Sequence, residues 1–154
     1  MTQYFREIFI ANPFDGAIPI LTFIAFVAVA LLLVVAFRRE PYPKLEMDMI
    51  KVVGLYIIWG MFQQFILVST FHLMVHIFKL EMSILLSAMI FGFVCHFSNR
   101  LLMAYTFGMA LVFLSHFSFY HNFYILGFAH GVIATIFEYV VPSNLTERMR
   151  VWSR

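Results

Sequence analysis

Charged residues are scarce in this sequence. Only 12% of its 154 residues are Asp, Glu, Lys or Arg, whereas soluble domains carry about 25%. The net charge of +2 at pH 7 is too small for a surface that binds a polyanion such as nucleic acid. Cys95 is the single cysteine and lies inside an apolar run, which excludes a disulfide-stabilised scaffold.

Apolar residues are correspondingly abundant. They make up 63% of the chain, aromatic residues make up 19%, and the mean hydropathy is +0.92. A soluble fold of this size leaves about a third of its unfolded-chain surface exposed, so it could not bury this much apolar surface. The composition therefore predicts an integral membrane protein and excludes a soluble enzyme domain.

Long uncharged runs separated by short polar links predict five membrane-spanning helices. A span needs about 20 apolar residues, so a chain of this length has room for little else. We expect an all-α, polytopic membrane bundle, because the strands of a barrel would be shorter and would alternate in polarity. The predicted apolar runs are residues 17–37, 49–78, 82–97, 101–117 and 123–141.

Basic residues favour one side of this five-span scheme. Only Arg6 and Lys79 fall on the other side. The positive-inside rule then places the N-terminus outside and the C-terminus in the cytoplasm. We expect the membrane to be a bacterial inner (plasma) membrane. The basic residues on the cytoplasmic side are Arg38, Arg39, Lys44, Lys51, Arg100, Arg148, Arg150 and Arg154.

The scheme divides the chain into five segments. The four-helix core follows a first helix and a short connection, and it is flanked by an outer N-terminal segment and a basic tail. The predicted segments are 1–16 outside, 17–37 as the first span, 38–49 as a cytoplasmic connection, 50–141 as the core and 142–154 as the cytoplasmic tail.

Polar side chains inside a membrane are costly, so each one in these runs is a candidate functional group. Gln63 and Gln64 fall near the middle of the second run and differ by about 100° around a helix, so at most one faces any single partner. They are read either as interhelical hydrogen-bonding residues or as remnant catalytic positions. The remaining candidates are His72, His76, His96, His116, His121, His130 and Glu138.

Four of these histidines are expected at the outer face. His72 and His76 are spaced i, i+4 on one helix face, which suits two ligands of one metal. His116 and His121 flank the link between the last two runs. Imidazole also suits an interface, because it joins an apolar body to a polar tip. We favour bonds to backbone carbonyls, lipid headgroups or a partner subunit over a metal or haem site.

Two stretches resemble motifs of a known family. The sequence IFGFVCHFSN, which ends at Asn99, and the sequence GFAHGVIA, which ends at Ala134, resemble the second and third motifs of the CAAX protease and bacteriocin-processing membrane family. The first motif of that family is a glutamate pair. Gln63 and Gln64 occupy the matching place. Gln63 is 33 residues before His96, which is itself 34 residues before His130.

The resemblance covers residues 54–141 and implies the four-helix core of that family. It also implies that one of the two glutamines, His96 and His130 meet in one cavity between the second, third and fifth spans. In the family the glutamates activate water, but glutamine cannot act as a general base. Val68 and Ala134 moreover stand where the family has Arg and Asn or Asp.

The resemblance thus implies a catalytically degenerate member of the family. Gln63, Gln64, His96 and His130 are then vestigial motif positions, and no catalytic residue or cofactor is expected. We favour a non-catalytic accessory or structural subunit of a larger membrane complex. Two alternatives stay open: an active peptidase of altered chemistry, and a metal- or haem-binding protein that uses the outer histidines. Lipids and other membrane subunits are the expected partners, and nucleic acid is not.

Overall fold

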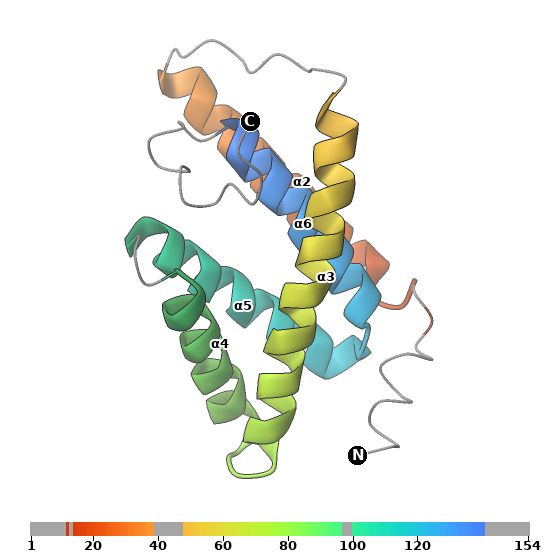
Figure 1. The fold of residues 1–154 in the computed structure, drawn as a ribbon, viewed down its shortest axis with the longest axis vertical. Helices are drawn as coiled ribbons and strands as arrows, with labels where there is room; N and C mark the ends of the chain where they lie inside the picture. The colour runs from red at the N-terminus through yellow and green to blue at the C-terminus, as the bar shows by residue number, and fades with distance from the viewer. Residues whose placement is uncertain (1–11, 13, 39–47, 97–99, 141–154) are drawn as a thin grey trace.

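Every secondary-structure element that the structure describes is a helix. The computed structural model describes residues 12, 14–38, 48–96 and 100–140, and no strand occurs among them. This confirms the predicted all-helical fold, and each helix overlaps one of the five predicted apolar runs. The helices are α2 (Ala17–Arg38), α3 (Asp48–Val75), α4 (Leu80–His96), α5 (Arg100–Tyr120) and α6 (Phe123–Val140) (Figure 1).

Two of these helices are long and apolar enough to cross a membrane. They include the stretches Lys51–Val75, of 25 residues, and Leu102–Tyr120, of 19 residues. At 1.5 Å per residue the first is about 37 Å long and the second about 28 Å, against a hydrocarbon core of about 30 Å. The apolar stretches in α2, α4 and α6 are shorter: Ala17–Leu31, Leu80–Val94 and Phe123–Phe137.

The most extensive helix contact joins α3 to α6, and it depends on glycine. A Cβ atom added at Gly131 would lie 2.4 Å from the Cα atom of Ile57. One added at Gly60 would lie 2.8 Å from the carbonyl oxygen of Gly127. Gly127 and Gly131 are one turn apart on α6, so they form a small-residue face that lets the two backbones approach closely.

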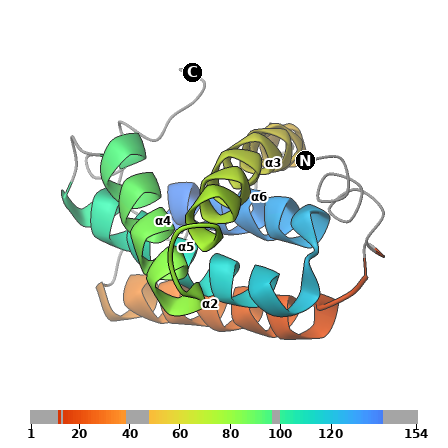
Figure 2. The same cartoon turned by 90° about the horizontal axis from the view of Figure 1, so that it is seen from below.

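The other helices are arranged around this pair. α6 lies between α3 and α2, while α4 and α5 form a second packed pair (Figure 2). In that second pair Gly92 also packs close to backbone, because a Cβ there would lie 3.0 Å from the Cα atom of Phe107. α4 returns antiparallel to α3 after a tight turn (Figure 1).

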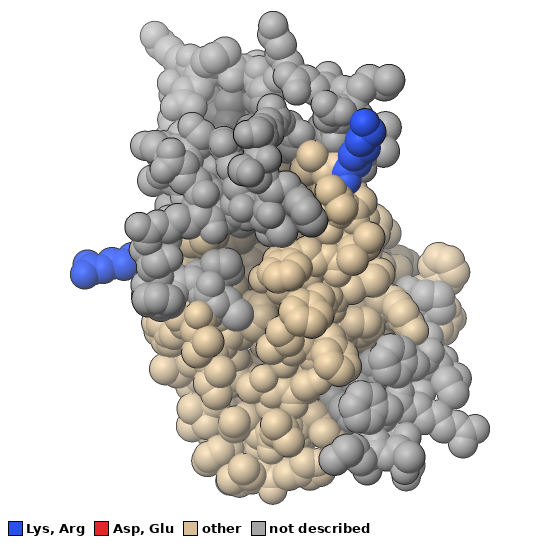
Figure 3. Space-filling model, viewed as in Figure 1, with Lys and Arg blue, Asp and Glu red and all other residues tan. Residues whose placement is uncertain are grey.

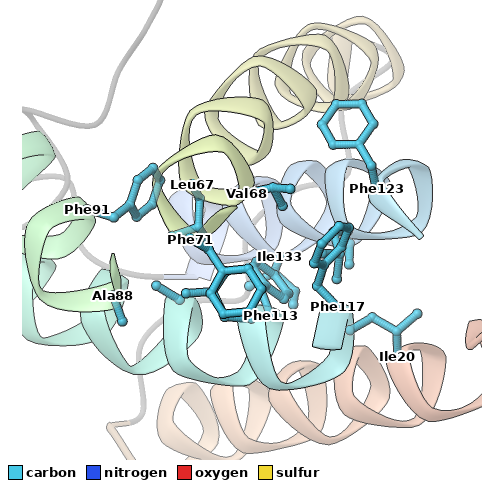
Figure 4. Close-up of a cluster of buried hydrophobic side chains, with 14 of the residues drawn as sticks. Ile20, Leu67, Val68, Phe71, Ala88, Phe91, Phe113, Phe117, Phe123 and Ile133 are labelled. Carbon is cyan, nitrogen blue, oxygen red and sulfur yellow. The ribbon is translucent and has the colours of Figure 1, made fainter. Parts of the chain in front are cut away.

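A cluster of phenylalanine and aliphatic side chains fills the space between α3, α5 and α6 (Figure 4). Phe71 and Phe117 meet edge to face, with ring centroids 6.3 Å apart, a geometry that aromatic pairs prefer. Leu67, Leu114 and Phe113 are fully buried beside them. This cluster fixes the position of α5 relative to the α3–α6 pair.

Many large apolar side chains lie on the exterior. On the face shown in Figure 3, nearly all described residues are uncharged, and basic side chains project only at its margins. Large apolar side chains are exposed along α2, α3 and α4, among them Ile18, Phe26, Ile58, Leu73 and Val94.

Replacing Gly131 with alanine should force α6 away from α3, because the added methyl would collide with the Ile57 backbone. Overpacking of this kind costs about 1–3 kcal/mol. Gly108→Ala is the matched control, since a Cβ at this helical position meets nothing within 4 Å. The control should be neutral or up to about 1 kcal/mol stabilising, because alanine favours helix. Denaturant unfolding of the purified protein measures both, and equal stability of the two variants would contradict the close α3–α6 contact.

Candidate functional site

A glutamine and a histidine meet inside the α3–α6 contact. The Nε2 atom of Gln64 lies 2.7 Å from the Nδ1 atom of His130. Gln64 lies one turn after Gly60 on α3, and His130 lies between Gly127 and Gly131 on α6. The glycines bring the two backbones close enough for these side chains to reach each other across the interface.

The pair is shielded from solvent. The Gln64 side chain is fully buried, His130 is half-buried, and the Phe113 ring lies 6.0 Å from the imidazole. With the amide nitrogen as donor, Nδ1 of His130 accepts, and the proton of the neutral ring is on its Nε2 atom. The Gln64 Oε1 atom is buried and accepts no hydrogen bond within the described part of the chain.

This arrangement joins α3 to α6 through one hydrogen bond between side chains. The Gln64 amide has no basic carboxylate, and Nδ1 of His130 is occupied by the hydrogen bond from Gln64. Val68 is 2% exposed and packs in the hydrophobic cluster, where the resembling family has Arg. Ala134 is also buried.

Of the four motif positions predicted from the sequence, the structure brings Gln64 and His130 together. Gln63 is half-buried. Its side chain points away from the contact, because adjacent residues on a helix differ by about 100° in direction. His96 is the last residue of α4, but its side chain lies outside the described residues, as does that of Glu138 in α6. The approach of His96 to the Gln64–His130 pair therefore stays a prediction.

The outer histidines separate into different environments. His72 and His76 face each other, with their Nε2 atoms 3.3 Å apart. His116 is buried and donates from Nε2 to the carbonyl oxygen of Gly16 at 2.9 Å. His121 is exposed and has a positive φ of 51° just after α5. No group of three or more His, Cys, Asp or Glu side chains within the described ranges could hold a metal ion.

Gly16 is required where it contacts His116. Its φ is +73°, and an added Cβ would lie 2.6 Å from Nε2 of His116 and 2.6 Å from Cγ of Tyr120. A side chain here would therefore break the hydrogen bond that fastens the start of α2 to the end of α5.

Asn122 connects two parts of the chain through its side chain, and it was not among the predicted site residues. Its Oδ1 atom accepts from the backbone N–H groups of Tyr124 and Ile125, at 3.1 and 3.2 Å, and so caps α6. Its Nδ2 atom donates to the carbonyl oxygens of Asn12, at 3.0 Å, and Asp15, at 2.8 Å. One fully buried side chain thus starts α6 and fastens the segment before α2. The position of this asparagine directly before an apolar run could have predicted the helix cap, because asparagine is a preferred N-cap residue.

Comparison of the chain with family models, with curated proteins and with solved structures gives no match. The family resemblance therefore stays a prediction, and the function is argued from the geometry above.

A double-mutant cycle should detect the Gln64–His130 bond. Gln64→Leu and His130→Leu should each destabilise the protein, and the double variant should lose less than the sum, with a coupling of about 0.5–1.5 kcal/mol. Gln63→Leu is the control, because the neighbouring glutamine points away from His130 and should show no coupling. Unfolding free energies supply the cycle, and equal coupling for both glutamines would contradict the contact.

Proposed function

We propose that this chain is an integral membrane bundle that serves as a non-catalytic accessory or structural subunit of a larger membrane complex. The observation that carries the proposal is the Gln64–His130 contact. The positions that would hold a catalytic glutamate and histidine in the resembling family are used here to hold two helices together, with the glutamine sealed from solvent.

The distribution of polar and apolar side chains supports insertion in a membrane. Gln64, Asn122 and Thr135 are buried, and each makes a hydrogen bond. Ile18 is 81% exposed and Ile58 is 69% exposed, and many other large apolar side chains face outward with them. Water would penalise this arrangement, whereas lipid favours apolar exteriors and internally satisfied polar groups.

The charges support one orientation in that membrane. Lys51 lies in the first turn of α3 and Arg100 begins α5, while Lys79 lies in the turn after α3. Because α3 and α4 run in opposite directions, Lys51 and Arg100 lie at one end of this hairpin and Lys79 at the other. The proposal places Lys51 and Arg100 in the cytoplasm of a bacterial cell and the N-terminus outside.

An aromatic face of α3 supports contact with another membrane protein. Trp59, Phe62 and Phe65 are spaced three residues apart and are exposed, and the first two rings lie 5.6 Å apart. Trp59 and Phe62 lie on the side of α3 away from Gly60 and Gln64, whereas Phe65 also packs edge to face on Phe123 of α6, with ring centroids 6.4 Å apart. Rigid aromatic side chains supply much of the binding energy at protein interfaces.

The test is purification in a mild detergent followed by native electrophoresis and mass spectrometry of the proteins that co-purify. We expect an assembly well above one 18.0 kDa chain and a loss of co-purifying subunits in Trp59→Ala/Phe62→Ala. Phe119→Ala is the matched control, since it removes an exposed aromatic side chain from α5. A monomer in every detergent that also hydrolyses membrane peptides, with the activity lost in His130→Ala, would contradict the proposal and establish the peptidase alternative.

A further inference from the structure

His72 and His76 form a matched pair of imidazoles at the end of α3. His72 lies in the last turn of the helix and His76 directly follows it. Their Nε2 atoms are 3.3 Å apart, their ring centroids are 4.7 Å apart, and the ring planes are inclined by 80°. His76 is exposed and His72 is half-buried, so the nitrogens can be reached from solution.

The separation of the two nitrogens fits a shared metal ion. Hydrogen bonds from N–H groups usually span about 2.7–3.2 Å. Two imidazole nitrogens, each about 2.05 Å from one tetrahedral metal ion, lie about 3.3–3.4 Å apart. The observed 3.3 Å matches this metal-bound distance, and in the metal-free chain the same two nitrogens share a long N–H···N hydrogen bond.

The local backbone holds the pair in this geometry. The N–H groups of Ile77 and Phe78 both donate to the carbonyl oxygen of Met74, at 3.0 and 2.8 Å. This turn fixes His76 immediately beyond the helix, one turn from His72. The carbonyl end of a helix also carries partial negative charge, which favours a cation there.

We propose that His72 and His76 chelate one divalent transition-metal ion, such as Zn²⁺, Ni²⁺ or Cu²⁺, through their Nε2 atoms. Imidazole suits these ions. Within the described ranges no third His, Cys, Asp or Glu joins the pair, so water or a ligand from solution fills the remaining positions. Structural zinc sites take four protein ligands, whereas sites with open positions exchange their ligands. The pair therefore binds a metal ion that can exchange with solution, and the fold does not depend on that ion.

The remaining histidines with described side chains do not offer this arrangement. His130 bonds to Gln64 through Nδ1, and His116 donates to the Gly16 carbonyl through Nε2. His121 is exposed but lies in a left-handed backbone position at the far end of α5.

Calorimetric titration of the full chain with ZnCl₂ tests the proposal. The protein is purified in detergent without a polyhistidine tag, and Co²⁺ is titrated separately to follow its visible absorption bands. We expect one metal ion per chain. His72→Asn and His76→Asn should each weaken binding by about tenfold or more, because each removes one of two ligands.

His121→Asn is the matched control. It also removes an exposed imidazole, and asparagine tolerates the left-handed backbone of this position. The control should bind metal like the unmodified chain, and all three variants should elute as the same species in size-exclusion chromatography. Absence of binding to the unmodified chain would overturn the proposal. Binding that falls equally in all three variants, or in none, would overturn it as well. None of these outcomes depends on whether the chain belongs to a larger complex.

Discussion

The close approach of α3 and α6 is the constraint on which the rest of the structure depends. Gly60, Gly127 and Gly131 remove the side chains that would hold these helices apart. Only at this separation can Gln64 reach His130, at 2.7 Å. Hydrogen bonds are electrostatically stronger in a low-dielectric interior than in water, so the pair fixes both the rotation and the register of the two helices. α2 then packs on the other side of α6, and α5 packs through the phenylalanine cluster.

The same constraint explains why the proposed role is structural. Gln64 has no basic carboxylate and is fully buried by the contact that it makes, which supports the proposed structural role. Val68 belongs to the apolar cluster one turn further along α3, so the hydrophobic packing continues through a position where the resembling family carries charge. The bundle therefore buries Gln64, Asn122 and Thr135 and exposes many aromatic and aliphatic side chains.

Much of this architecture could be predicted because it is local. Uncharged runs determine helices, and the i, i+4 spacing alone placed His72 beside His76. The sequence also predicted that one of two adjacent glutamines would face His130, but not which one, since that depends on how α3 is rotated against α6. Partners distant in sequence could not be predicted: His116 bonds to Gly16, and Asn122 bonds to Asn12 and Asp15. The packing role of Gly127 and Gly131 became clear only from the α3 backbone beside them.

The central claim is that α3 crosses a membrane with the Gln64–His130 contact inside it. Cysteine accessibility tests this most directly, with Lys51→Cys and Lys79→Cys made separately in a Cys95→Ser background. Both lysines are exposed and they bracket the longest apolar stretch, Lys51–Val75. In sealed vesicles a membrane-impermeant maleimide should label the two positions from opposite sides. Labelling of both from the same side, or recovery of the chain in the soluble fraction, would contradict the account.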